Sequence, residues 1–158
     1  MVTKFPERTK KDMDNWSYFF HAADQWREAW LIMQEDKSKN NSWLFYVESH
    51  ILYFSLELFI KSIISYHIND FDAKKELLGH SATKIINKYK NIVSIFNKID
   101  TNKVLVNLIK EYENTLSTRF GDTGAMCDGG DEKLIIDTID ELREYMCRQT
   151  GLRSILIT

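Results

Sequence analysis

Apolar residues recur every three or four positions along most of this chain, which is the spacing of amphipathic helices. Short polar or glycine-containing segments separate the periodic stretches. We expect helices at about 14–36, 42–67, 82–97, 101–120 and 132–148. The pattern therefore predicts an all-α fold, a single up-and-down bundle of about five helices.

The second predicted helix is apolar around most of its circumference, so we expect it to lie centrally among the others. Its middle reads "ILYFSLELFI" over residues 51–60. Glu57 interrupts this run, which is far shorter than the roughly 20 apolar residues that span a bilayer. We therefore expect no membrane association.

Length and composition fit one helical domain. The chain has 158 residues with 44% hydrophobic residues, one proline and six glycines, and a chain of this size buries a real core. Residues 1–11 are basic and predict a mobile N-terminal segment before a domain at 12–158. The apolar segment 152–158 is expected to dock, at a place that its sequence does not indicate.

The net charge is −2, with acids and bases mixed along the chain, so any attraction to nucleic acid or anionic membrane must be local. Cys127 and Cys147 have no metal-type CxxC partner and follow no secretion signal, which predicts a reducing, cytoplasmic location. No cofactor fingerprint or zinc pattern is present. The glycine-rich loop 121–131 does not match the EF-hand spacing, so we predict no metal site there.

Four residues of the second predicted helix, at offsets of four, seven and eleven, fall on one narrow stripe: His50, Phe54, Glu57 and Lys61. Glu57 and Lys61 are an i,i+4 pair in the favourable order and can neutralise one another as a structural pair. The alternative is a solvated helix edge. A second stripe with Ser55 and Ser62 would let another helix approach closely, most simply by core packing.

Three segments carry a family resemblance: "YFSLELFIKSII" at 53–64, "GHSATKIINKY" at 79–89 and "STRFGD" at 117–122. Together they resemble the central part of HEPN domains, over about residues 42–121. The resemblance implies a compact helical bundle that often forms a homodimer with a cleft between protomers. It also implies that Arg119 faces this cleft, where we expect an anion site of Arg119, Lys61 and His80.

Many HEPN proteins are ribonucleases that use an arginine, four to six residues, and then a histidine. Here Arg119 is followed at the required positions by Gly124, Ala125 and Met126, so this pair is missing. His80, or more remotely His50, could serve with Arg119 only if the fold brings them together. A Gly-His pair at a helix start is more often structural, and Arg119 has the alternative of capping its helix.

These features leave three functions open. The first is a HEPN-like dimeric domain that binds a nucleotide, RNA or a protein partner, as is common in prokaryotic defence and toxin–antitoxin settings. The second is a divergent metal-independent ribonuclease that uses His80 or His50 with Arg119. The third is a purely structural dimerisation adaptor.

Overall fold

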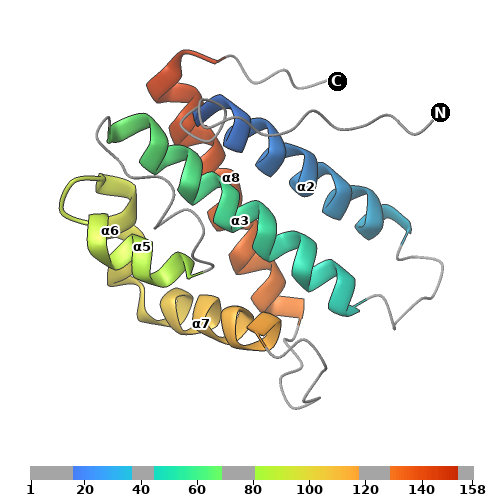
Figure 1. Cartoon of the computed structure of the whole chain (residues 1–158). Coiled ribbons are helices and arrows are strands. Elements are labelled where there is room, and N and C mark those ends of the chain that lie inside the picture. Colours follow the sequence, from blue (N-terminus) through green and yellow to red (C-terminus); the bar gives the residue numbers. More distant parts are fainter. Residues whose placement is uncertain (1–15, 37–44, 69–80, 118–128, 153–158) are drawn as a thin grey trace.

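The computed structural model describes residues 16–36, 45–68, 81–117 and 129–152 (Figure 1). These residues form a helical bundle without strands, which confirms the predicted all-α class. The helices are α2 (Trp16–Asp36), α3 (Phe45–His67), α5 (Ala82–Tyr89), α6 (Ser94–Thr101), α7 (Lys103–Ser117) and α8 (Gly129–Thr150). The predictions for segment 1–11, for residues 121–128 of the glycine-rich loop and for residues 153–158 of the C-terminal segment 152–158 fall outside the described residues.

Helix α3 is the centre of the bundle, as its sequence predicted. It contacts α2, α5, α7 and α8, and Figure 1 shows α2 along one side of it and α5–α7 along the other. Its side chains at Leu52, Leu56, Phe59, Ile60 and Ile63 have no exposed surface. Burial of apolar area on this scale is the main favourable contribution to folding. No helix within the described ranges combines the length and apolarity that a membrane span requires.

Small residues of α3 allow α2 to approach closely. The Ser55 hydroxyl donates to the carbonyl oxygen of Ala23 at 2.9 Å, and the Ser62 hydroxyl donates to that of Trp16 at 2.8 Å. Both serines are fully buried, so these hydrogen bonds satisfy hydroxyls that would otherwise cost free energy. The stripe with Ser55 and Ser62 therefore belongs to packing within the chain.

Two ion pairs connect α2 with α8, one with its cation on α2 and the other with its cation on α8. Arg27 Nε donates to Asp140 Oδ1 at 2.6 Å, and Arg143 Nε donates to Asp24 Oδ1 at 2.6 Å. The hydrogen bond to Asp24 is the main reason why the pKa of Arg143 is raised. Because each helix supplies one cation and one anion, the pairs fix the register of α2 against α8.

The prediction of one continuous helix at 82–97 is wrong, because a turn divides this stretch into α5 and α6. The described part of the chain therefore has six helices rather than five. The N–H groups of Ile92 and Val93 both donate to the carbonyl of Tyr89, at 3.0 and 2.9 Å, and Val93 is extended with φ −109° and ψ 108°. This turn buries Val93 completely and leaves Ile92 67% exposed. A continuous helix over 82–97 would carry both residues on its apolar face.

Other boundaries and faces also differ from the expectation. Helix α8 begins at Gly129 rather than near Glu132 and extends to Thr150, where Gly151 follows with φ 71°, the left-handed conformation that commonly ends a helix. Val104 and Trp26 share the three-four apolar spacing of their helices, which predicts burial, but they are 72% and 41% exposed.

Candidate functional site

Glu57 and Lys61 form an ion pair in the interior. Lys61 Nζ donates to Glu57 Oε1, and the two side chains are only 7% and 4% exposed for Lys61 and Glu57. At the other end of the same stripe, His50 is half-buried and Phe54 is 37% exposed. The stripe therefore passes from the surface into the core, and the solvated-edge alternative does not describe the Glu57–Lys61 pair.

Tyr53 lies one turn before Glu57 and connects α3 to the start of α5. Its hydroxyl accepts a hydrogen bond from the backbone N–H of Ala82 at 3.4 Å. Burial, followed by the charges of Glu113 and Glu57, raises the pKa of Tyr53 far above its ordinary value. The phenol therefore stays neutral and polar within a region that holds two carboxylates.

The N-terminus of α5 is held by a carboxylate from α7. Glu113 accepts hydrogen bonds from the Thr83 backbone N–H at 2.9 Å, from the Thr83 hydroxyl at 2.9 Å, and from the Ser81 hydroxyl at 3.3 Å. The Ser81 hydroxyl also accepts from Lys84 N as the N-cap. The first N–H groups of a helix have no partner within it and carry partial positive charge, so a carboxylate there is favourable.

These contacts join two of the segments that carry the family resemblance, because Tyr53 belongs to 53–64 and Ala82 to 79–89. His80 and Arg119, the other residues of the predicted anion site, lie outside the described residues. Lys61 donates to Glu57, so an anion at Lys61 would compete with that carboxylate. The anion site and the ribonuclease alternative stay predictions.

A surface contact between aromatic side chains was missed by sequence reasoning. The ring centroids of Trp26 on α2 and Phe54 on α3 are 5.9 Å apart, and His50 lies 6.3 Å from Phe54. Val47 precedes His50 and Phe54 on α3, at helical spacing, and is 48% exposed. We call Trp26, Val47, His50 and Phe54 the Trp26 patch. Helical spacing could not reveal it, because the same spacing describes a buried face.

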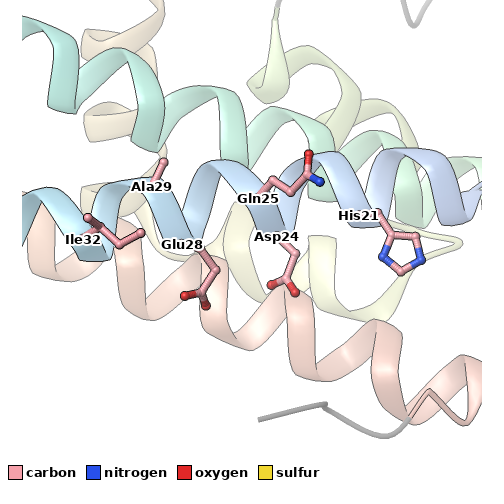
Figure 2. Close-up of a pocket in the computed structure, with 6 residues that line it drawn as sticks. All are labelled: His21, Asp24, Gln25, Glu28, Ala29 and Ile32. Carbon is pink, nitrogen blue, oxygen red and sulfur yellow. The ribbon is translucent and has the colours of Figure 1, made fainter. Parts of the chain in front are cut away.

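Two surface hollows are lined by other residues. One, of about 400 Å³, follows α2 and contains Asp24 and Glu28 (Figure 2); these carboxylates already pair with Arg143 and Arg27. The other, of about 510 Å³, lies between α6 and α8. Its charges also pair, with Lys98 Nζ 2.8 Å from Glu141 Oε2. No predicted site residue is among the described residues that line either hollow.

In the described parts of the chain, no three or more His, Cys, Asp or Glu side chains are grouped so as to hold a metal ion. Comparisons of the sequence with protein-family models and with curated proteins, and of the structure with solved structures, found no match.

Proposed function

We propose that the chain is a HEPN-like helical domain that acts by binding rather than by RNA cleavage. In this proposal it forms a homodimer and binds a nucleotide, RNA or a protein partner, in the cytoplasm of a prokaryote and in a defence or toxin–antitoxin setting. The hydrogen bond between Tyr53 and Ala82 supports the assignment, since it packs two resemblance segments against one another.

The observation that carries the binding function is the Trp26 patch. Large aromatic side chains that stay partly exposed and touch across two helices are typical of surfaces that another protein covers. The patch contains no Asp, Glu, Lys or Arg whose charge would repel an identical surface. A second copy of the chain, related by a twofold axis, is therefore the partner that we propose for it. Comparing the solution mass of the native protein with that of Trp26→Ser tests this step.

The ligand part of the proposal concerns Arg119. A guanidinium stays charged and can grip a phosphate with two parallel hydrogen bonds. Titrations with nucleotides and short RNAs, for the native protein and for Arg119→Ala at two salt concentrations, test this role. A phosphate contact predicts weaker binding and a shallower salt dependence in the variant. Arg148→Ala is the matched control, because Arg148 is 68% exposed and pairs with its helical neighbour Glu144.

The ribonuclease alternative makes a stricter demand. RNA cleavage by the native protein that disappears in His80→Ala or His50→Ala, with the fold retained, would replace the binding proposal. If no ligand binds and Arg119→Ala changes only the melting temperature, the structural adaptor replaces it instead.

A further inference from the structure

Charge is unevenly distributed over the bundle. Residues 81–117, which contain α5, α6 and α7, hold six lysines and three carboxylates, a net charge of +3. Helix α2 has four carboxylates against Arg27, and α8 has six carboxylates against three cations, so each has a net charge of −3. Figure 1 shows α5–α7 on the side of α3 that faces away from α2. Within the described residues, the side formed by α5–α7 is therefore basic, although the total charge of the chain is −2.

Lysine side chains of the basic side converge on Asp100, near the C-terminal end of α6. Lys90 Nζ donates to Asp100 Oδ2 at 2.9 Å, and Lys103 Nζ donates to the backbone oxygen of Asp100 at 3.0 Å. The hydrogen bond from Lys90, followed by the charges of Lys90, Lys103 and Lys110, lowers the pKa of Asp100. The ammonium groups of Lys90 and Lys103 thus both bond to Asp100, and their two charges exceed that of its single carboxylate.

Helix α7 extends this group of lysines along the surface. Lys103, Asn107, Lys110 and Asn114 follow one another at spacings of four, three and four residues, which places them on one helix face, and all four are exposed. Eleven residues of helix cover about 16 Å. Lysine and asparagine side chains at such spacing are the donors that commonly contact phosphate and sugar oxygens of nucleic acids.

The same surface has no exposed aromatic ring and no arginine among residues 81–117. The rings of Tyr89, Phe96 and Tyr112 are 8%, 0% and 2% exposed, and they are the only aromatic side chains in 81–117. Single strands are usually held by stacking on exposed rings, and guanine is read most often by a bidentate arginine, which this segment does not contain. Without exposed rings to hold a single strand, the surface fits the phosphate backbone of a duplex.

We propose that the α5–α7 surface around Lys90, Lys103 and Lys110, the lysine face, binds the phosphate backbone of a double-stranded nucleic acid without reading its sequence. This surface lies on other helices than the Trp26 patch, and it includes none of the residues of the predicted Arg119 site. The inference therefore depends neither on the HEPN-like assignment nor on dimer formation.

Fluorescence anisotropy of labelled RNA and DNA duplexes, titrated with the full chain at several salt concentrations, tests the lysine face. The test variant is Lys103→Gln with Lys110→Gln. The control is Lys133→Gln with Arg148→Gln on α8, which removes the same charge from side chains that are 74% and 68% exposed. The test variant should bind more weakly, and the slope of log affinity against log salt should become shallower by about 2, one for each lost phosphate contact. The control should keep the native slope.

Three results would overturn the inference: no duplex binding by the native protein, an equal loss in the control variant, or tighter binding of single strands of the same length. Binding to either duplex supports it, and the tighter of the two identifies the natural class. Thermal melts of both variants show whether the fold is retained. The solution mass reports on the proposed homodimer separately.

Discussion

The carboxylate of Glu113 on α7 accepts two 2.9 Å hydrogen bonds from Thr83 on α5, one from its backbone N–H and one from its hydroxyl. The two residues are 30 positions apart in sequence, and the contact ties the start of one helix to the side of another. With Tyr53 on α3 bonded to Ala82, three helices meet at the N-terminus of α5.

We expect Glu113→Ala to destabilise the fold by about 2 kcal/mol, because it removes a charged acceptor from two donors in a half-buried place. Glu111→Ala, two residues away on the exposed side of α7, is the control and should change stability by about 0.5 kcal/mol or less. Urea unfolding followed by circular dichroism measures both. Equal effects of the two substitutions would show that the Glu113 contact contributes nothing specific.

Lys61→Met should destabilise the protein by about 3–5 kcal/mol, because it leaves the Glu57 carboxylate buried without its cation. Lys133 offers a matched control: it forms the same i,i+4 type of pair with Asp137, but the two side chains are 74% and 53% exposed. Lys133→Met should cost about 1 kcal/mol or less.

The double variant Glu57→Leu with Lys61→Met removes both charges and should recover much of the stability that Lys61→Met loses. Denaturant midpoints of the four proteins decide the matter. A Lys61→Met midpoint indistinguishable from that of Lys133→Met would mean that the interior pair is not a structural element.

The sequence predicts the helical class well and the contacts between helices poorly. The order and spacing of Glu57 and Lys61 indicate a pair, but its burial depends on the helices that pack on α3 from elsewhere in the chain. The Glu113–Thr83 contact leaves no local pattern at either residue. At 90–93 the apolar spacing continues across a turn, because periodicity reports which residues are buried and not whether the helix is continuous.

Trp26 illustrates the same limit at the surface. Its helical spacing matches the core residues of α2, yet it is 41% exposed beside Phe54. Only the relative placement of α2 and α3 shows which aromatic side chains remain uncovered.

Stability should fall as the pH drops below about 6.5, partly through His67. Its ring nitrogen Nε2 lies 2.8 Å from the Tyr145 hydroxyl, and burial lowers its pKa below the ordinary value of 6.5. As the pH falls, His67 therefore takes up a proton in the unfolded chain before it does so in the folded one. The stability present above pH 6.5 decreases progressively until the pH reaches the folded pKa of His67, below which it changes no further. Melting temperatures at pH 7.5 and 5.5 should differ less for His67→Gln than for the native protein.

Tyr145→Phe is the control for this effect. It removes the hydrogen bond but leaves the ring of His67 buried, and burial is the stated cause of the shift. Its melting temperature should be lower at both pH values, with the native pH difference retained. A native pH difference in His67→Gln would assign the acid sensitivity to other groups.

The solution mass measured by light scattering at micromolar concentration tests the central claim most directly. The proposal predicts twice the 18.7 kDa chain mass for the native protein, and a shift toward the monomer for Trp26→Ser with Phe54→Ser. Ile32→Ser, which removes an apolar side chain that is 63% exposed elsewhere on α2, should leave the mass unchanged. A native mass of one chain, or a dimer that persists in the patch variant, would contradict association through the Trp26 patch.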